Sequence, residues 1–248
     1  MIEIKKRKNE RKYSRIRAEA DDIIQQRKRI SCLSVREAEQ GRIEGGRRNV
    51  EASCLIGRKD KTNAQDTGAI KNSQELKLEE WASYEKIWFD NAGIKENWKR
   101  IDDGTSVEAE VYDFGVNVRK VFHYKVFSDY PMDFINDRIS IHNGLFPDTK
   151  YELIGFTKTE KGFAFVLEQP YIDGADCATE EEIEEFMKVI GFPNREDKEY
   201  WNDYYTVKDI HPGNVLKVKD RDGSFKMFVI DPIPSLGGKS EYLPFRVI

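Results

Sequence analysis

Cysteine, histidine and long apolar runs are scarce in this sequence. Its 248 residues include three histidines and three cysteines, and the cysteines at positions 32, 54 and 177 form no CxxC pair. This scarcity argues against a structural zinc site and against a disulfide framework. No apolar run approaches the roughly 20 residues that span a bilayer, and charged residues follow the first few positions too closely to leave a signal-peptide core. We therefore expect a cytoplasmic protein.

Charge, by contrast, is abundant, since charged residues make up 35% of the chain and apolar residues 39%. Residues 1–78 hold 20 Lys and Arg against 12 Asp and Glu, a net charge of +8. The remainder holds 21 against 33, a net charge of −12, which leaves −4 for the whole chain. We therefore expect a basic extension and linker over residues 1–72 and a different, folded domain over residues 73–248.

The basic part contains two helix-compatible stretches and a polar segment. The run that starts at Lys5 has few apolar positions, which predicts a solvated helix. Ser34 and Glu37 have the spacing of a capping box and predict the start of a second helix. Residues 57–73 are polar and rich in turn formers, so we predict a flexible linker there.

The cations between Lys5 and Arg17 leave three interpretations open. They could contact nucleic acid through its phosphates. The stretch has one aromatic residue, Tyr13, which gives no basis for stacking on single strands. They could instead form a charged helix that docks on the acidic part of the chain, or serve only as a solubilising tail.

The acidic part is predicted to contain helices and hairpins in alternation. After Ser73 an apolar stripe at helical spacing predicts a helix that must pack against other elements; the stripe comprises Leu78, Trp81, Tyr84 and Trp88. Three β-hairpins are predicted from apolar runs on either side of turn-forming residues. They span residues 108–121, 151–171 and 214–231, with turns at Gly115, Gly162 and Gly223.

Two further helices separate the hairpins. Pro131 favours the first turn of a helix, and we expect His142 and Asn143 to cap its end. Thr179 and Glu182 have capping-box spacing and predict a second helix, which stops at Gly191. The order of strands, helix, strands, helix and hairpin indicates an α+β fold.

Four residues in these elements have the chemistry that phosphoryl transfer from ATP requires. That reaction needs a lysine on the phosphates, an acid near the proton of the nucleophile, and oxygen ligands for Mg²⁺. Lys120 lies in a predicted strand, and Asp209 and Asn214 lie five positions apart on the loop before the last hairpin. Asp231 ends the last apolar strand. A plain surface turn is the alternative for the loop, because Pro, Gly, Asn and Asp are common turn residues.

From about Trp81 to Ile248 the chain resembles a divergent protein-kinase-like domain. The motif DIHPGNVL…FVIDP is similar to the catalytic and metal loops of aminoglycoside and choline kinase-type phosphotransferases. The segments VRKV, ISIHNGLFPDTKYELIGF, LEQPYI and IDPI are closer still to the Ser/Thr/Tyr kinase domain found in polyvalent proteins of phages and mobile elements. The resemblance implies a reduced, bilobal kinase-like fold with a helical, basic N-terminal extension. It implies a small sheet lobe over about residues 101–168 and a truncated second lobe over about residues 172–248.

The resemblance also implies roles for the four residues of the motif. Asp209 would be the catalytic acid of the loop that orients or deprotonates the acceptor hydroxyl. Asn214 and Asp231 would be ligands of Mg²⁺, and Lys120 would bind the phosphates of ATP.

Four more residues receive roles by resemblance alone. Gly104 would lie in the phosphate-binding loop. Gln169 and Tyr171 would contact adenine through their main chains, because the Pro170 between them has no N–H. Asp137 is the nearest acid that could pair with Lys120, since the helix after this lysine contains no Glu.

Two functions of different classes follow. The first is an ATP- and Mg²⁺-dependent phosphotransferase, with a protein Ser, Thr or Tyr hydroxyl as the acceptor and a small molecule as the runner-up. The second is a pseudokinase that acts as a nucleotide-binding interaction module. A single glycine where kinases usually have three, and a Pro directly after Asp231, favour the second. The joint presence of Lys120, Asp209, Asn214 and Asp231 favours the first.

Overall fold

The computed structural model of the protein describes residues 10–15, 17–18, 52 and 67–237. The helix predicted from Ser34 and residues 57–66 of the predicted linker lie outside the described residues. The chain divides into two compact units. Unit 1 comprises Met1–Asn136 and Tyr151–Gln169, and unit 2 comprises Asp137–Lys150 and Pro170–Ile248. The architecture mixes helices with antiparallel sheets, as the α+β prediction requires.

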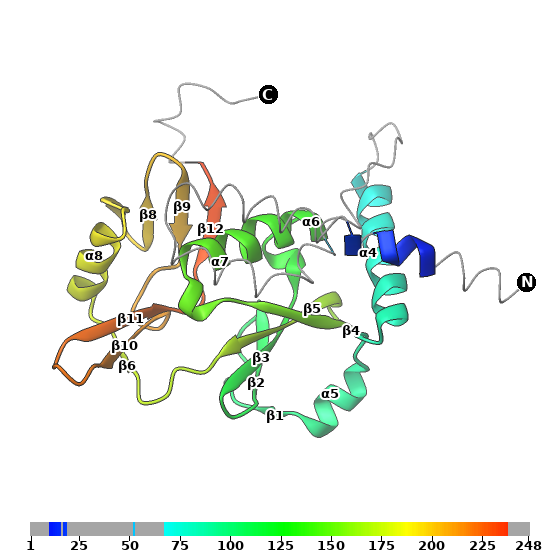
Figure 1. The fold of residues 1–248 in the computed structure, drawn as a ribbon, viewed down its shortest axis with the longest axis horizontal. Helices are drawn as coiled ribbons and strands as arrows, with labels where there is room; N and C mark the ends of the chain where they lie inside the picture. Colours follow the sequence, from blue (N-terminus) through cyan, green and yellow to red (C-terminus); the bar gives the residue numbers. More distant parts are fainter. Residues whose placement is uncertain (1–9, 16, 19–51, 53–66, 238–248) are drawn as a thin grey trace, which may run out of the picture. The chain divides into compact units, whose positions relative to one another are not determined.

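Unit 1 is built on a five-stranded sheet with the order β1-β2-β3-β5-β4 (Figure 1). Its strands are β1 (Lys99–Arg100), β2 (Ala109–Asp113), β3 (Asn117–Phe122), β4 (Glu152–Thr159) and β5 (Gly162–Pro170). Both predicted hairpins of this unit are confirmed, because β2 pairs antiparallel with β3 and β4 with β5. Gly115 and Gly162 have φ of 74° and 105°, which a residue without a Cβ adopts at little cost.

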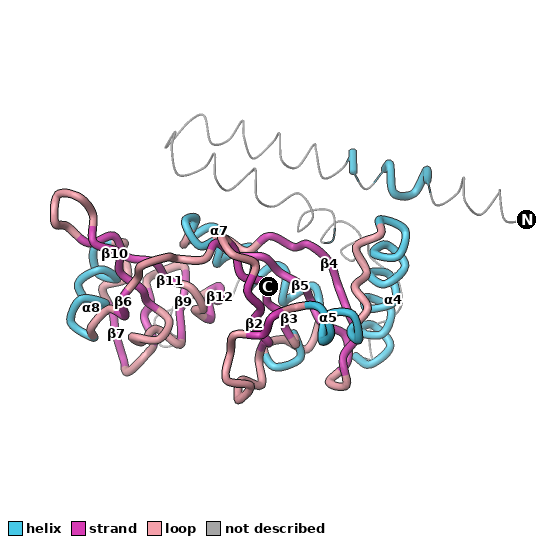
Figure 2. Tube along the Cα trace, turned by 90° about the horizontal axis from the view of Figure 1, so that it is seen from below, coloured by secondary structure: helices cyan, strands magenta, loops and turns pink. Residues whose placement is uncertain are grey.

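Helices α4 (Thr67–Glu85) and α5 (Asn91–Asn97) precede the sheet. In both views α4 lies beside β4, which it contacts (Figure 1, Figure 2). The prediction of a flexible linker is wrong for residues 67–73, which form the first turns of α4. Polar residues there carry no apolar stripe, but a helix extends easily from turns that are already packed.

The predicted aromatic stripe is only partly helical. Leu78 and Trp81 are buried on α4, whereas Tyr84 is exposed. Trp88 lies beyond the helix and forms a parallel bridge with Phe156 of β4. The helix ends first because Lys86 adopts a left-handed backbone with φ of 59°, a common way to terminate a helix.

The described part of the basic extension packs on α4. Residues 10–15 are helical, and the ring of Tyr13, which is 1% exposed, lies 4.4 Å from that of Tyr84. Lys12 Nζ lies 3.1 Å from a carboxylate oxygen of Glu80, and Arg17 pairs with Glu85. These contacts agree with the interpretation of a charged helix that docks on acidic residues of the domain.

The core of unit 1 is aromatic. Rings from the sheet and from the helical segment that follows β3 contact one another edge to face or tilted, at centroid distances between 4.8 and 5.8 Å. The set is Phe122, Phe134, Phe156, Phe163 and Phe165, and each of them is buried. Rings at these separations add directional contacts to the burial of apolar area.

A helical run extends from Pro131 to Leu145 in three consecutive elements: α6 (Pro131–Asp133), the π-helical segment η2 (Phe134–Ile141) and α7 (His142–Leu145). Pro131 occupies the first turn, as predicted. The expected cap at His142 is wrong, because this residue begins α7. Its buried ring forms a hydrogen bond with the next loop instead, and its Nε2 lies 2.8 Å from the carbonyl oxygen of Thr149.

The described residues of unit 2 form two small sheets and one longer helix. The first sheet has the order β11-β10-β6 and the second β12-β9-β8-β7. The strands are β6 (Asp176–Cys177), β7 (Asn194–Glu196), β8 (Glu199–Trp201), β9 (Tyr205–Lys208), β10 (Val215–Lys219), β11 (Phe225–Val229) and β12 (Ile233–Leu236). The predicted last hairpin is confirmed as β10 and β11. The second sheet was not predicted.

Helix α8 (Glu180–Val189) confirms the predicted capping box. The Glu182 N–H donates to the Thr179 hydroxyl at 3.3 Å, and the Thr179 N–H donates to the Glu182 carboxylate at 2.7 Å. Gly191 follows the helix with φ of 92°, as a predicted stop. The helix buries Ile183 and Met187 in the core of unit 2, which fixes it beside β10.

Candidate active site

The predicted catalytic loop lies between β9 and β10 in unit 2. Its first residue, Asp209, has a left-handed backbone with φ of 60°, which is uncommon for a residue other than glycine and is frequent at functional sites. The next residue, Ile210, is fully buried, and its N–H donates to the carbonyl of Lys198 at 3.0 Å. A buried anchor therefore fixes the loop directly beside a partly exposed carboxylate.

The side chain of Asn214 contacts both acidic residues of the predicted site, Asp209 and Asp231. Its side-chain amide nitrogen donates to the main-chain oxygen and to Oδ2 of Asp209, both at 2.9 Å. The same nitrogen lies 3.3 Å from the main-chain oxygen of Asp231. Because these contacts occupy the amide nitrogen, they orient the side chain and leave its Oδ1 atom to face other groups.

Asp231 is brought to Asn214 by the hairpin. Val215 of β10 pairs with Val229 of β11, and the N–H of Ile230 donates to the carbonyl of Asn214 at 2.9 Å. Asp231 therefore lies just beyond the end of β11, close to Asn214, which directly precedes β10. The structure places Asp209, Asn214 and Asp231 together, as the sequence predicts for facing positions of a hairpin.

The donor set fits a hard divalent cation. Mg²⁺ takes oxygen ligands, keeps part of its water shell and is commonly held by one or two protein groups together with substrate phosphates. The amide oxygen of Asn214 and the carboxylate of Asp231 are donors of that kind. Among the described residues, no cluster of three or more His, Cys, Asp and Glu side chains could hold a metal ion.

Lys120 lies in β3 of unit 1, opposite Val111 of β2. It is 3% exposed, and its Nζ lies 5.6 Å from the centre of the Tyr151 ring. A lysine is rarely so deeply buried unless other groups stabilise its charge. Lys120 is therefore not a solvated strand residue.

The remaining residues of the predicted site are distributed over both units. Gly104, with φ of 78°, lies in unit 1 on the connection between β1 and β2, and a Cβ there would meet only the Arg100 guanidinium at 3.8 Å. Gln169 is buried near the end of β5. In unit 2, Tyr171 is 51% exposed, and Asp137 lies half-buried in η2.

The strand residues before Gln169 are held firmly. Glu168 accepts a hydrogen bond from Arg119 Nε at 2.8 Å and one from the Asn117 side chain at 3.0 Å. The Arg119 guanidinium also lies 3.8 Å from the centre of the Phe114 ring. Neighbouring main-chain positions on β3 and β5 are therefore fixed by side chains that the sequence did not single out.

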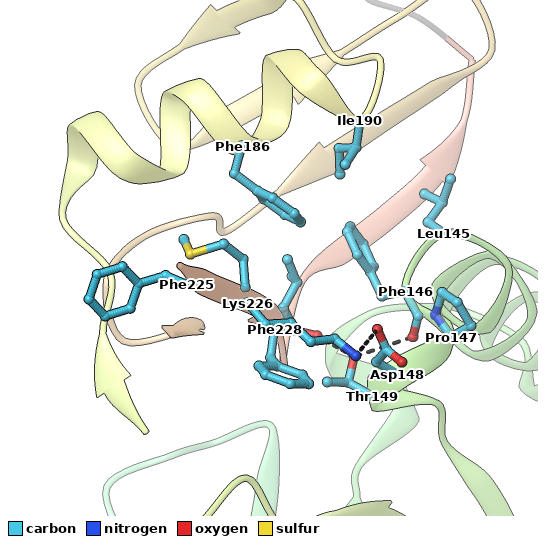
Figure 3. A pocket seen from close by; sticks show the side chains of 12 residues that line it. Leu145, Phe146, Pro147, Asp148, Thr149, Phe186, Ile190, Phe225, Lys226 and Phe228 are labelled. Carbon is cyan, nitrogen blue, oxygen red and sulfur yellow. Dashed lines mark hydrogen bonds and ion pairs between the residues drawn. The ribbon is translucent and has the colours of Figure 1, made fainter. Parts of the chain in front are cut away.

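A separate cavity of about 390 Å³ lies within unit 2 (Figure 3). Its wall is mostly apolar and includes Phe146, Phe186 and Met227. At its edge Lys226 Nζ lies 3.2 Å from Asp148 Oδ2, as the dashed line in Figure 3 shows. None of the predicted site residues lines this cavity.

One further contact lies inside the catalytic loop. His211 Nε2 lies 3.4 Å from Asp209 Oδ1, and the His211 ring accepts a hydrogen bond from Gly213. The need for glycine at position 213 was not evident from the sequence. A Pro-Gly pair is a common turn, so composition could not reveal that an imidazole packs on the glycine.

The chain is similar in sequence to a known kinase family. A model of the serine/threonine/tyrosine kinase found in polyvalent proteins matches residues 71–236. The match begins inside α4 and ends with β12, so it includes Lys120 and the complete Asp209 loop. Neither the curated proteins nor the solved structures contain a match to the chain. The chain belongs to the family of serine/threonine/tyrosine kinases found in polyvalent proteins.

Proposed function

We propose that this protein is an ATP- and Mg²⁺-dependent phosphotransferase that acts on a hydroxyl group, with a protein Ser, Thr or Tyr as the acceptor. The arrangement of Asp209, Asn214 and Asp231 supports the proposal most directly, because the three residues converge at the open end of one hairpin. A plain surface turn has no need of an amide that bridges two acidic residues. A kinase-like function also agrees with the family.

In the proposed reaction the acceptor hydroxyl oxygen attacks the γ-phosphorus of ATP, and the bond between this phosphorus and the oxygen of ADP breaks. Asp209 orients the hydroxyl and accepts its proton, so that a phosphate ester and ADP are formed. Lys120 neutralises charge on the phosphates. Main-chain groups near Gly104 contact the phosphates, and those of Gln169 and Tyr171 contact adenine. Asp137 is the proposed acid partner of Lys120.

Asn214 and Asp231 would hold Mg²⁺, which neutralises charge on the phosphates when it is bound. The hydrogen bonds of the Asn214 amide nitrogen turn its oxygen away from Asp209 and Asp231 main-chain groups. In this proposal the sheet of unit 1 would bind the nucleotide, and unit 2 would carry the catalytic loop. A reduced bilobal kinase has its functions assigned to two parts in the same way.

We also propose an origin, a cellular location and a binding partner for the protein. We propose a protein of a phage or mobile element that acts in the cytoplasm, as the resemblance to kinases of polyvalent proteins implies. The described part of the chain contains no helix that could span a membrane. Nucleic acid remains a proposed partner of the basic extension. The pairs that Lys12 and Arg17 form with acids of α4 favour the docked interpretation for those two residues.

The test is transfer of radiolabelled γ-phosphate from ATP in the presence of Mg²⁺, with host lysate as a source of acceptors. We expect label on a protein for the wild type and a loss of about 100-fold or more for Asp209→Asn and Asp231→Asn. Asparagine is the suitable replacement at position 209 because it tolerates a left-handed backbone. Asp220→Asn, on the exposed turn between β10 and β11, is the matched control and should retain full transfer.

The same samples distinguish the second candidate, a nucleotide-binding pseudokinase. The single glycine at the β1–β2 connection is the observation that favours it. A Mg²⁺-dependent rise in melting temperature with ATP, lost in Asp231→Asn but without transfer in any sample, would identify that module. Transfer that persists in both site variants would contradict the proposed assignment of the site.

A further inference from the structure

The imidazole of His211 connects two groups of the catalytic loop. Its Nδ1 accepts the main-chain N–H of Gly213 at 3.1 Å, and its Nε2 lies 3.4 Å from Oδ1 of Asp209. A neutral imidazole carries a single N–H. Because Nδ1 is the acceptor, the hydrogen is on Nε2, the nitrogen that lies nearer the carboxylate of Asp209. The loop itself therefore selects the tautomer that can donate to Asp209.

Gly213 makes this position of the ring possible. A Cβ built on Gly213 would lie 2.9 Å from Cε1 and 3.2 Å from Nδ1 of His211. The backbone of Gly213 does not have the positive φ of the turn glycines. Glycine is therefore required here by the close approach of the ring, and any side chain would push the imidazole away from the loop.

The two oxygens of Asp209 consequently face two different donors. Oδ1 faces His211 Nε2, and Oδ2 accepts the hydrogen bond from the Asn214 amide at 2.9 Å. We propose that His211 is a positioning residue: held in its Nε2–H tautomer by Gly213, it fixes the rotation of the Asp209 carboxylate toward the acceptor hydroxyl. This inference rests on the proposed phosphotransferase function, in which Asp209 receives the proton of that hydroxyl.

Loss of the His211 imidazole should change kcat but not the binding of ATP. In the proposed arrangement His211 acts through the carboxylate of Asp209 and has no direct role toward the nucleotide or Mg²⁺. Loss of the imidazole should therefore lower kcat by about 10- to 100-fold, the usual effect of a misplaced catalytic group. The KM for ATP and the Mg²⁺ concentration that gives half-maximal rate should stay within about twofold of wild type.

Two substitutions of His211 test the roles of its two ring nitrogens separately. His211→Gln places an amide donor near the position of Nε2, and His211→Asn places an acceptor near the position of Nδ1. We expect His211→Gln to keep most of kcat and His211→Asn to lose it, although His211→Asn preserves the cap on the Gly213 N–H. If both variants lose kcat equally and in step with melting temperature, the role is structural and the inference fails.

Gly213→Ala tests the same contact without changing a polar group. It should lower kcat in the wild type but have little further effect in His211→Asn, which has no ring for the methyl group to displace. Such non-additivity is expected of groups in direct contact. Independent, additive losses from the two substitutions would contradict the inference.

A measurement that does not depend on activity completes the test. Long-range ¹⁵N–¹H correlations report the tautomer of each of the three histidines, and the His211→Asn variant assigns the His211 signals. At about pH 8, where an ordinary imidazole is neutral, we expect the Nε2–H form, weakened in Gly213→Ala. An Nδ1–H form or an even mixture overturns the inference even in an active enzyme. Absence of transfer by the wild type overturns the proposed function instead, and the tautomer still decides the geometry.

Discussion

The side-chain amide nitrogen of Asn214 lies 2.9 Å from Oδ2 of Asp209 and 2.9 Å from the main-chain oxygen of the same residue. One amide thus contacts both the backbone and the carboxylate of a residue whose φ is 60°. The bond to the main chain supports the left-handed conformation, and the bond to Oδ2 aims the side chain. Asn214 is also proposed to hold the cation, through the oxygen of its side-chain amide.

Replacement of Asn214 by Ala should therefore affect Mg²⁺ dependence and rate together. We expect the Mg²⁺ concentration for half-maximal transfer to rise about 10- to 100-fold, the range seen when groups that support a metal site are removed. Measurement of label transfer over a Mg²⁺ titration checks this. An unchanged titration with a reduced maximum rate would show that Asn214 supports Asp209 alone.

His123 predicts how stability depends on pH. The ring is 3% exposed, and burial, helped by the positive charge of Lys161, lowers the pKa of His123 below its ordinary value of 6.5. Glu110, whose carboxylate oxygen lies 3.8 Å from Nε2, opposes the shift. Since the unfolded chain takes up the proton first, His123 contributes stability that is present above about pH 6.5 and is lost as the pH falls below it.

The variant His123→Phe removes this titration while it keeps a ring in the core. We expect melting temperatures of the wild type to fall more steeply than those of His123→Phe between about pH 6.5 and 5. Above that window the two curves should run parallel. Parallel curves over the whole range would show that the buried imidazole is not linked to folding.

Gly155 in β4 is required by close packing. A Cβ at this position would lie 2.1 Å from the carbonyl oxygen of Ile87 and 2.5 Å from the Phe89 ring. The Phe156 N–H donates to that same carbonyl at 3.0 Å. Gly155→Ala should therefore break this short bridge and lower the free energy of unfolding by about 1–3 kcal/mol.

Gly144 in α7 supplies the matched control. A Cβ there meets nothing within 4 Å, so Gly144→Ala should be neutral or stabilise the protein by up to about 1 kcal/mol. Urea unfolding of both variants checks the pair. Equal effects of the two substitutions would contradict the packing argument at Gly155.

Tyr13 tests whether the basic extension is an integral part of unit 1. Its ring is 1% exposed and packs on Tyr84, and burial raises its pKa to about 12, with Glu80 and Glu85 adding to the shift. Tyr13→Ala should cost about 3–5 kcal/mol, as large aromatic deletions in cores do. Arg15→Ala, an exposed neighbour, should cost less than about 0.5 kcal/mol. Equal thermal unfolding of both variants would identify the extension as a tail.

Local sequence patterns were sufficient to predict the elements around the candidate active site. Gly223 lies at the turn that joins β10 to β11, and Thr179 with Glu182 forms the capping box of α8. Both patterns act over a few residues, so neighbouring side chains alone specify them. The meeting of Asn214 with Asp231 followed directly from the hairpin register.

The contacts that the sequence could not show are long in range or steric. The sheet that contains β7 and β12 has an edge strand with all three residues exposed, so no alternation of apolar residues marks it. Trp88 kept the helical spacing although Lys86 had already ended α4. Gly155 lies within a predicted strand and Gly213 in a Pro-Gly turn, and neither pattern reveals the groups that pack on these glycines.

The position of Asp231 between two strands has a consequence for local opening. β11 ends at Val229 and pairs with β10, whereas β12 begins at Ile233 and pairs with β9. Asp231 is thus tethered on both sides, to different sheets, by a connection of three residues. Hydrogen exchange of β12 should therefore report on the same opening that releases the carboxylate. A nucleotide bound with its cation should slow that exchange. Fraying of β12, rather than movement of a long flexible segment, would then be the event that opens the proposed cation site.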